Sequence, residues 1–458
     1  MKLTALLTSL VFACAPALAT GYFVNNNGSD TNPGTQTAPW KTIAKVNAST
    51  FHAGDRILLQ GGQTFQGPLI LTAASGFGNA TNSIGVEPYG SGVATISSTG
   101  NGIEVKDTQG YFFANLVIDG GNHATNTGSG IYLVNDRPGN VKIGPIKVDT
   151  VTVRNFGYDG ISIYGLNGAS GWNPVTIINS AIYGNRDGIQ SYALANGAHQ
   201  NIFIDKVVVH DNPGRSASGN PTGSGIVLGQ VDGATIQRCV AHGNGASNTN
   251  AAGPVGIWCY DANNVVIQYC ESYNNTGGTG EDGDGFDLDI NTSNSTLQYN
   301  FSHGNTGAGY LIGGGGSTTI GGNTIKYNVS QNDGIKNAFA GIEIYGNVYN
   351  DNIESNWIFS GAPAAAGIRI SPGSHLTNLR VSKNTVFVTG SLPIVRADTT
   401  VGATFSGNDY WRLDGSFLLS WAGVQYSSLS AWKAATGQES GTGSNTSPPL
   451  LWSPSPIQ

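Results

Sequence analysis

Gly256-Ile257-Trp258-Cys259 and Gly285-Phe286-Asp287-Leu288 show the pattern that decides the fold: glycine, an apolar residue, one variable residue and a second, mostly apolar residue. The pattern starts at Gly130, Gly160, Gly188, Gly225, Gly256, Gly285, Gly309, Gly341 and Gly367. The spacing between successive glycines is about 24 to 37 residues. A unit repeated at such a period is typical of a solenoid, and the variable spacing indicates loops of different length on a constant scaffold.

Two further segments recur in step with the glycine pattern. One is apolar and β-branched, as in Val175-Thr176-Ile177-Ile178 and Val265-Val266-Ile267-Gln268. The other ends in asparagine, at Asn185, Asn212, Asn244, Asn275 and Asn305. We expect these asparagines to adopt the left-handed conformation at tight corners and to bond to their neighbours in adjacent coils.

Rings lie two residues before four of these asparagines, at His210, His242, Tyr273 and His303. Matching positions in successive repeats would stack these rings on one another. The histidines are therefore interpreted as structural rather than catalytic.

Three short strands in about 30 residues, with apolar side chains at every second position, leave few architectures. A propeller blade needs four strands in about 40 to 50 residues. We therefore predict an all-β, right-handed parallel β-helix (a solenoid) of about ten coils over residues 90–400. Residues 22–85 should supply an N-terminal cap and the first coils, and residues 427–438 a short C-terminal capping helix, because an open coil end exposes edge strands.

The composition describes an exported, acidic protein. The net charge is -7 without a basic tract, so electrostatic binding to nucleic acid is not expected. The apolar run from Leu3 to Ala15, followed by Ala17-Leu18-Ala19, predicts a cleaved signal peptide, and Cys14 leaves a lipoprotein signal as the alternative.

These observations predict a secreted (extracellular or periplasmic) monomer without a membrane span. We expect a signal peptide over residues 1–19, one β-helix domain over residues 20–440 and a Pro/Ser-rich tail over residues 441–458.

Three cysteines follow the expected signal peptide: Cys239, Cys259 and Cys270. An odd count argues against a disulfide framework. Cys239 and Cys270 occupy matching positions of successive repeats, so stacked core thiols are favoured over a bridge. Neither a Cys-x-x-Cys motif nor a histidine cluster suggests zinc.

Both ends of the chain carry a family resemblance. The start, Tyr22-Phe23-Val24-Asn25-Asn26-Asn27-Gly28-Ser29-Asp30 with Ala38-Pro39-Trp40-Lys41-Thr42-Ile43, resembles the pectate-lyase-like right-handed parallel β-helix superfamily. Gly54-Asp55-Arg56-Ile57 and the stretch over residues 430–438 fit the same pattern. The superfamily includes polysaccharide lyase family 9 and several β-helix glycoside hydrolases. The resemblance implies the fold and a polysaccharide partner, whereas one scaffold hosts many reactions.

One acidic segment resembles the calcium-binding run of family 9 pectate lyases. It reads Asp282-Gly283-Asp284-Gly285-Phe286-Asp287, and the comparison implies Asp284 and Asp287 as calcium ligands. Gly283 stands where the family has another aspartate, and the adjacent Asp282 is the third candidate ligand. One coil later those lyases carry a lysine base, and this chain has Leu311 there. Calcium is therefore the one cofactor that the sequence suggests. The lysine base of the family reaction is missing from its expected position.

Strand alternation places the variable residue of each glycine-pattern strand outside the coil. Stacking gives a column that we expect to face solvent: Tyr132, Ser162, Gln190, Val227, Trp258, Asp287, Leu311, Glu343 and Arg369. A parallel column two residues on contains Tyr164, Tyr192, Tyr260, Asp289 and Tyr345. We expect Trp258, Tyr260, Tyr192, Tyr345 and Arg369 to bind substrate, since flat aromatic rings offer apolar faces for sugar rings.

Asp287, Asp289 and Glu343 are the expected catalytic residues. Asp287 and Asp289 are two residues apart on one strand, about 7 Å, and Asp287 and Glu343 are two coils apart, about 10 Å between backbones. Inverting glycosidases hold two carboxyl groups about 6.5 to 9.5 Å apart. Asp287 is the expected central carboxylate, whose change to asparagine should abolish activity. A surface ion pair between Glu343 and Arg369 is the alternative interpretation of that pair.

Three functions follow from this pattern. The leading hypothesis is a secreted glycoside hydrolase that acts on a polysaccharide. The second is a calcium-dependent polysaccharide lyase, which needs a cation for the uronate and a base, with Arg186, Lys336 and Arg369 as candidates. The third is a non-catalytic glycan-binding β-helix.

Overall fold

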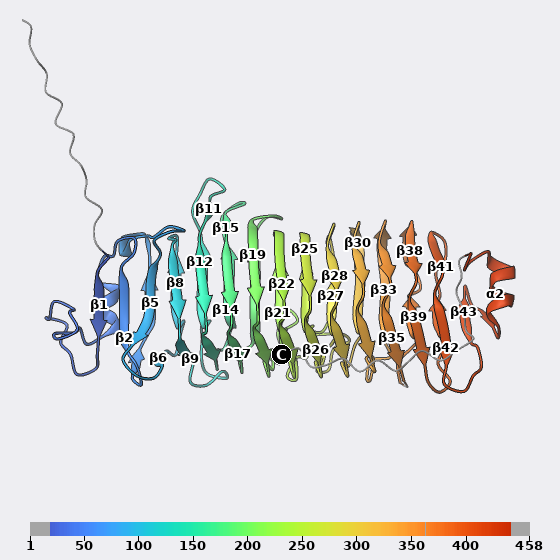
Figure 1. Ribbon diagram of the computed structural model, residues 1–458, viewed down its shortest axis with the longest axis horizontal. Coiled ribbons are helices and arrows are strands. Elements are labelled where there is room, and N and C mark those ends of the chain that lie inside the picture. The colour runs from blue at the N-terminus through green and yellow to red at the C-terminus, as the bar shows by residue number, and fades with distance from the viewer. Residues whose placement is uncertain (1–18, 362, 441–458) are drawn as a thin grey trace, which may run out of the picture.

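The computed structural model describes residues 19–361 and 363–440, which form one parallel β-helix with its coils side by side along the long axis (Figure 1). The predicted signal peptide, apart from residue 19, and the predicted tail lie outside the described residues. The paired strands of the three main sheets run parallel, except for the antiparallel β43–β44 pair at the C-terminal end. The all-β solenoid predicted from the repeat is confirmed.

Each coil contributes one strand to each of three sheets. Sheet 1 contains β1 (Gly21–Val24), β2 (Arg56–Gln60), β5 (Ile84–Tyr89), β8 (Tyr111–Ala114), β12 (Ile146–Asp149), β16 (Val175–Ile178), β19 (His199–Asp205), β22 (Val231–Gln237), β25 (Asn263–Gln268), β28 (Thr296–Gln298), β31 (Thr324–Lys326), β34 (Asn352–Glu354), β38 (Leu379–Ser382) and β41 (Ala403–Ser406). Sheet 2 contains β4 (Leu69–Leu71), β7 (Ile103–Lys106), β10 (Ile131–Asn135), β14 (Asp159–Gly165), β18 (Asp187–Ala193), β21 (Ile226–Gly229), β24 (Ile257–Tyr260), β27 (Phe286–Leu288), β30 (Tyr310–Gly321), β33 (Ile342–Tyr349), β36 (Ile368–Ile370), β37 (His375–Thr377), β40 (Val395–Ala397), β43 (Leu419–Trp421) and β44 (Val424–Tyr426). Sheet 3 contains β3 (Thr64–Gln66), β6 (Ala94–Ser97), β9 (Leu116–Asp119), β13 (Thr152–Arg154), β17 (Ala181–Tyr183), β20 (Val208–His210), β23 (Val240–His242), β26 (Glu271–Tyr273), β29 (Phe301–His303), β32 (Val329–Gln331), β35 (Trp357–Ser360), β39 (Thr385–Val388) and β42 (Asp409–Arg412).

The glycine-pattern strands make sheet 2, and the predicted register is confirmed. Trp258 pairs with Asp287, Asp287 with Leu311, and Leu311 with Glu343 in successive coils. The apolar residues on either side of the variable one, such as Phe286 and Leu288, are fully buried inside the coil. In the described chain sheet 3 has 13 strands, about one for each coil, so the solenoid has slightly more coils than the ten predicted.

Buried asparagine ladders connect the coils at their corners. The backbone N–H and the side-chain amide of Asn275 both donate to Oδ1 of Asn305, at 2.9 and 3.0 Å. The same two bonds run from Asn185 to Asn212 and from Asn212 to Asn244. The predicted bonding between coils is confirmed, and it satisfies polar groups that burial would otherwise leave unpaired.

The predicted left-handed conformation of these asparagines is wrong. Positive φ falls one residue earlier, on Gly184, Asp211, Gly243, Asn274 and Gly304. The corner is therefore turned just before the asparagine, whose side chain points inward to form the ladder. The rings of Tyr183, His210, His242, Tyr273 and His303 stack at 4.7 to 5.0 Å, which confirms the predicted stacking.

The first ladder, which runs from Asn185 to Asn305, ends at the carboxylate of Asp333. Asp333 accepts both bonds from Asn305, and its second oxygen accepts from the Ser330 hydroxyl at 2.7 Å. Burial raises the pKa of Asp333 to about 6. One coil earlier the amide of Asn305 bonds to the Ser302 hydroxyl at 3.0 Å, so an asparagine amide at residue 333 would find the same partner in Ser330.

We expect Asp333→Asn to stabilise the protein at pH 8 by on the order of 2 kcal/mol, and to leave stability unchanged at pH 4. The folded-state pKa of Asp333 lies above the ordinary value of 3.8, so stability decreases as pH rises from about 4 to about 6 and stays low above it. Thermal unfolding at both pH values measures the effect, with exposed Asp136→Asn as the control. Equal gains at both pH values would contradict a protonation effect.

Both ends of the coil stack are closed. Helix α1 (Ile43–Asn47) buries Ile43 and Val46 near the N-terminal coils, and a short 3-10 turn, η1 (Ala73–Ser75), follows β4. Helix α2 (Leu429–Thr436) is the predicted C-terminal capping helix and lies at the far end of the stack in Figure 1. Its Trp432 is fully buried against Phe405, Tyr410 and Trp421, with ring centroids 5.4 to 6.0 Å apart.

Cys239, Cys259 and Cys270 are buried free thiols, and the backbone N–H of Cys239 donates to the Cys270 sulfur at 3.4 Å. The preferred prediction of stacked thiols is confirmed. In the described part of the chain no helix is long and apolar enough to cross a membrane.

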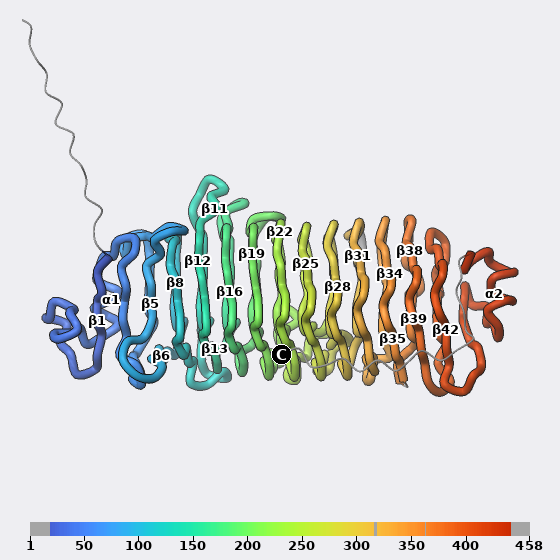
Figure 2. The backbone as a smooth tube through the Cα atoms, viewed as in Figure 1, coloured from blue at the N-terminus to red at the C-terminus, as the bar shows by residue number. Residues whose placement is uncertain are grey.

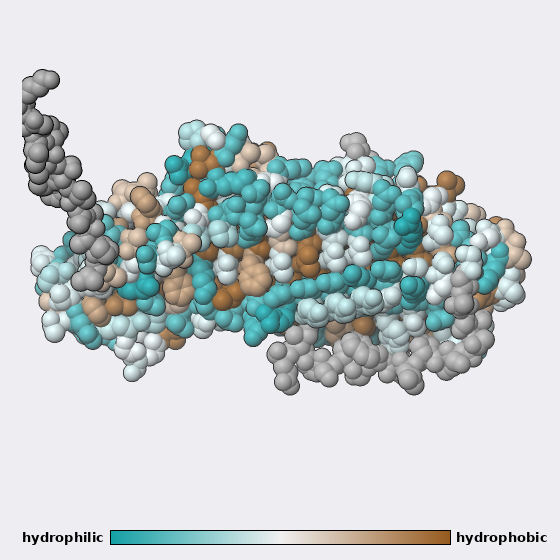
Figure 3. All heavy atoms as spheres, turned by 45° about the horizontal axis from the view of Figure 1, so that its top comes forward, coloured by the Kyte–Doolittle hydropathy of each residue, from teal (hydrophilic) through white to brown (hydrophobic). Residues whose placement is uncertain are grey.

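The loops between strands differ in length, as the uneven spacing predicted. One group, with the two-strand sheet of β11 (Lys142–Ile143) and β15 (Gly171–Trp172), projects from the body of the helix in Figure 2. The face shown in Figure 3 is largely hydrophilic, with hydrophobic residues in separate spots along the long axis.

Candidate active site

A cleft of about 1040 Å³ opens on the outer side of sheet 2, over the coils of β27 to β36. Its lining includes Glu281, Asp282, Asp289, Leu311, Tyr345 and Arg369. The volume is that of a ligand site, and several carboxylates converge on it. Asp289, Tyr345 and Arg369 are three of the predicted site residues, and the structure brings them together here.

Asp287 and Glu343 lie beneath this surface rather than on it. Their exposed fractions are 3% and 1%, so the prediction that the variable column faces solvent is wrong at these positions. The loops that lead from sheet 3 into sheet 2 join one another over the column: Gly253 N–H donates to Asp282 Oδ2 at 3.0 Å, and Gly283 N–H donates to the Pro254 carbonyl at 3.0 Å. These loops bury the outer face of the strands.

Asp287 is a buried carboxyl without a cationic partner. Its Oδ1 is buried and has no hydrogen-bond partner. Burial, together with the neighbouring charges of Asp289, Asp284 and Asp282, raises the pKa of Asp287 well above its usual range. The protonated form of Asp287 is therefore favoured.

Asp284 is also buried. One of its two carboxyl oxygens has the same kind of partner as the matching aspartate of an earlier coil, and the other does not. Its Oδ1 accepts from Ala308 N–H, as Oδ1 of Asp187 accepts from Ser224 N–H at the matching position. Its Oδ2 has no partner, whereas Oδ2 of Asp187 is paired with Arg186 at 2.7 Å. Burial first, and then Asp282, raise the pKa of Asp284 well above its usual range.

Two of the three carboxylates that line the cleft, Asp282 and Asp289, titrate nearer to neutral pH. Burial raises the pKa of Asp289 to about 6, against the opposing effect of a bond from the Tyr345 hydroxyl at 3.3 Å. Burial also raises the pKa of Asp282 to about 6, with Asp289 and Glu281 adding to the rise. Two carboxyls of this kind in one cleft can exchange protons with a bound molecule near pH 6.

Glu343 and Arg369 form an ion pair at the edge of the cleft, in which Glu343 is buried and Arg369 is half-buried. Glu343 Oε1 lies 3.4 Å from Arg369 Nη1 and accepts from the Ser371 hydroxyl at 2.5 Å, and Oε2 accepts from Ala340 N–H at 3.2 Å. Burial raises the pKa of Glu343 to about 7 despite the nearby Arg369. The alternative prediction of an ion pair between Glu343 and Arg369 is confirmed, although Glu343 is buried rather than at the surface.

Calcium finds no complete ligand set here. In residues 19–361 and 363–440 no three His, Cys, Asp or Glu side chains are arranged to hold a metal ion. Asp282 Oδ2 already accepts a hydrogen bond from Gly253 N–H, and Asp284 Oδ1 already accepts one from Ala308 N–H. The predicted set of Asp282, Asp284 and Asp287 therefore does not fit a calcium ion as arranged, and no reaction step is derived through one.

Trp258, Tyr260 and Tyr192 lie outside the cleft lining, in coils before it on the same sheet. The Trp258 indole N–H donates to the Ser224 hydroxyl at 3.0 Å, and its ring lies 5.3 Å from that of Tyr260. Tyr192 is 38% exposed and packs edge-on against Tyr164 at 6.0 Å. These aromatic residues can contact a long chain that extends from the cleft, but not a sugar confined to it.

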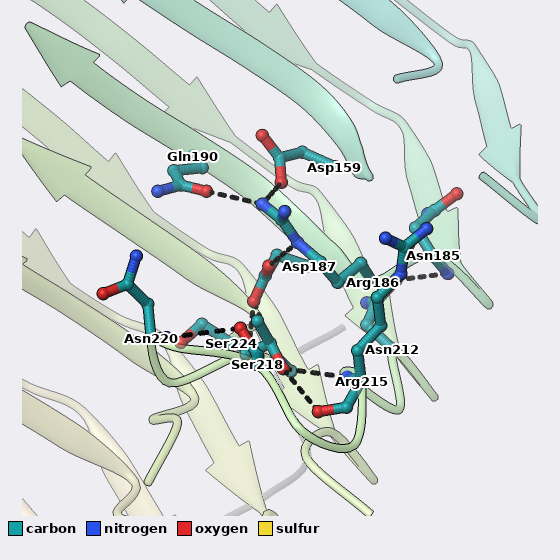
Figure 4. A network of polar contacts seen from close by, with 12 residues as sticks. Asp159, Asn185, Arg186, Asp187, Gln190, Asn212, Arg215, Ser218, Asn220 and Ser224 are labelled. Atoms are coloured by element: carbon teal, nitrogen blue, oxygen red, sulfur yellow. Dashed lines mark hydrogen bonds and ion pairs between the residues drawn. The ribbon is translucent and has the colours of Figure 1, made fainter. Parts of the chain in front are cut away.

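A second polar cluster on sheet 2 was not predicted. Figure 4 shows Arg186 between Asp159 and Asp187, with ion-pair distances of 2.5 and 2.7 Å. Oδ2 of Asp159 also accepts from the hydroxyls of Ser162 and Tyr164. The available signal was the aspartate directly before the glycine in both repeats, a position shared with Asp284. Asp187 Oδ1 also accepts from Ser224 N–H in the next coil, so the cluster connects three coils.

Each candidate lyase base already interacts with another group of the protein. The two aspartates raise the pKa of Arg186 despite its burial, so it stays protonated. Lys336 donates to the Gly278 carbonyl, and Arg369 faces Glu343. Leu311, at the family position of the base, is 3% exposed.

Comparisons with known proteins agree with the observed fold. Residues 139–325 match the family model for the right handed beta helix region. A comparison with curated sequences returns no match. The GH136 lacto-N-biosidase from Eubacterium ramulus superposes with a TM-score of 0.58 at 16% identity, over 85% of this chain and 67% of that chain.

Two epimerase modules from Azotobacter vinelandii are similar in the same way. The mannuronan C-5 epimerase AlgE4 A-module gives a TM-score of 0.58 at 17% identity, over 80% of this chain and 95% of that chain. The AlgE6 A-module gives 0.53 at 17% identity, over 78% and 90%. At these identities the likeness shows the fold alone, a right-handed parallel β-helix.

Proposed function

We propose that this chain is a secreted glycoside hydrolase that cleaves a polysaccharide, with Asp289 and Asp282 as its acid–base pair. The observation that carries the proposal is the pair itself: two carboxylates, each with a pKa of about 6, line one cleft. Glycoside hydrolysis needs one carboxyl that donates a proton to the leaving oxygen and one that acts as base or nucleophile. The β-helix neighbours include a lacto-N-biosidase, which is consistent with this chemistry.

The surroundings of the two carboxyls suggest their roles. Asp289 accepts a hydrogen bond from Tyr345, which favours its ionised form, so it is assigned as base or nucleophile. The charges of Asp289 and Glu281 favour the protonated form of Asp282, so it is assigned as the acid. Asp287 and Asp284 lie behind the pair, and Arg369 and Tyr345 are placed to contact the sugar.

A calcium-dependent lyase has less support from the same residues. Its uronate substrate would bring negative charge to a cleft that already holds Glu281, Asp282 and Asp289, and the lining cation Arg369 faces Glu343. The candidate bases are engaged, and the expected calcium ligands are not arranged as a set.

A product assay tests the proposal. The protein is incubated with neutral and uronate polysaccharides, with and without a chelator, and both new reducing ends and unsaturated uronate absorbance are measured. We expect reducing ends without unsaturated products and without a chelator effect. Unsaturated, chelator-sensitive products would overturn the hydrolase proposal, and binding without any product would favour a non-catalytic glycan-binding protein.

A further inference from the structure

The ring of Tyr345 lies directly above a glycine of the preceding coil. Gly313 in β30 pairs with Tyr345 in β33. A Cβ atom placed on Gly313 would collide with the Tyr345 ring carbons Cε1, Cδ1 and Cζ. The φ angle of Gly313 is outside the left-handed region, so other residues could adopt its backbone conformation. The absence of a side chain at residue 313 therefore serves to make room for the ring.

The space above Gly313 lets the phenol reach one coil further. The Tyr345 hydroxyl donates to Asp289 Oδ1 at 3.3 Å, and Asp289 follows β27, two coils before β33. The ring thus crosses the coil of Gly313 to reach the carboxylate. Both Tyr345 and Asp289 line the cleft.

We propose that Gly313 and Tyr345 form a positioning pair, in which the glycine admits the ring and the phenol hydroxyl fixes the reacting orientation of the Asp289 carboxylate. This inference rests on the proposed function, in which Asp289 is the base or nucleophile. Reacting groups must be held close to their productive geometry, and a misplacement of about 1 Å can cost about 100-fold in rate.

The same two strands contain a matched control. Gly321 in β30 pairs with Tyr349 in β33, and a Cβ atom on Gly321 would collide with the ring of Tyr349 in the same way. Tyr349 is 40% exposed and does not line the cleft. Gly321→Ala thus repeats the steric change of Gly313→Ala without touching the site.

The experiment measures kcat and KM on the polysaccharide that the wild-type protein cleaves. We expect Tyr345→Phe and Gly313→Ala each to lower kcat by about 10- to 100-fold. Tyr345→Phe should leave KM within about twofold, because the ring that faces the substrate remains. Gly321→Ala should leave kcat and KM at wild-type values, and thermal unfolding of each variant reports folding.

A double variant separates positioning from a general disturbance of the strand. If Gly313→Ala acts by moving the hydroxyl, adding it to Tyr345→Phe should lower kcat by less than about threefold further, whereas independent effects would multiply. Multiplying effects, an equal loss in Gly321→Ala, or full activity of Tyr345→Phe would overturn the positioning role. Full activity of Asp289→Asn would instead overturn the proposed function, so the two failures are distinguishable.

Discussion

Asp289→Asn should lower kcat by about 1000-fold, with the protein still folded. Asparagine has nearly the same shape as aspartate, but it can neither accept a proton nor attack a sugar carbon, and acid–base groups contribute about 100- to 10,000-fold in rate. Asp289 lines the cleft and accepts a bond from Tyr345, which an asparagine oxygen can still accept. Initial rates on the cleaved polysaccharide, with thermal unfolding as the folding check, measure the loss.

Asp287→Asn gives the comparison for this variant. The sequence predicted Asp287 as the central carboxylate, whereas the structure buries it below the cleft and favours its protonated form. Because asparagine resembles a protonated carboxyl in shape and charge, we expect a loss of about tenfold or less, well below that of Asp289→Asn. The reverse order of the two losses would return the central role to Asp287.

Trp432→Ala should produce the largest loss of stability, about 3 to 5 kcal/mol. The indole is fully buried in the C-terminal cap, where it contacts Phe405, Tyr410 and Trp421. Its removal leaves a cavity and loosens α2 from the last coil, so that strand edges become available for pairing with another chain. Thermal unfolding and size-exclusion chromatography measure the two effects.

Trp411→Ala is the matched control for the cap variant. Trp411 lies in β42, also near the C-terminal end, but is only half-buried. It should cost clearly less stability and leave the protein monodisperse. Equal losses in the two variants would show that Trp432 has no special role in closing the coil stack.

The repeat was sufficient to predict the coil, since strand alternation and the glycine spacing are local properties. It correctly placed Asp287 between Trp258 and Leu311 in neighbouring coils. It could not predict that loops would bury Asp287 and Glu343, because the connections that cover them vary in length and sequence from coil to coil. For the same reason the sequence indicated Asp282 only as a calcium ligand, whereas its loop places it in the lining of the cleft together with Asp289.

The Asp159–Arg186–Asp187 cluster was missed for a different physical reason. Arg186 was considered only as a base, because its partners lie in the preceding coil and in the next residue, where sequence alone gives no contact. The αL residues were misplaced by one position, since either the asparagine or its predecessor could turn the corner.

The asparagine ladders run in one direction. In the second of them Asn300, Asn328, Asn356, Asn384 and Asn408 each donate to the next side chain toward the C-terminus, and Glu439 accepts the last bonds. Every internal asparagine both donates and accepts a hydrogen bond, so a duplicated internal coil would leave no ladder side chain without a partner. The final member only has to accept the last bonds. The protein can therefore grow or shrink by whole coils during evolution or design, provided that each ladder still ends in a side chain that accepts the last bonds.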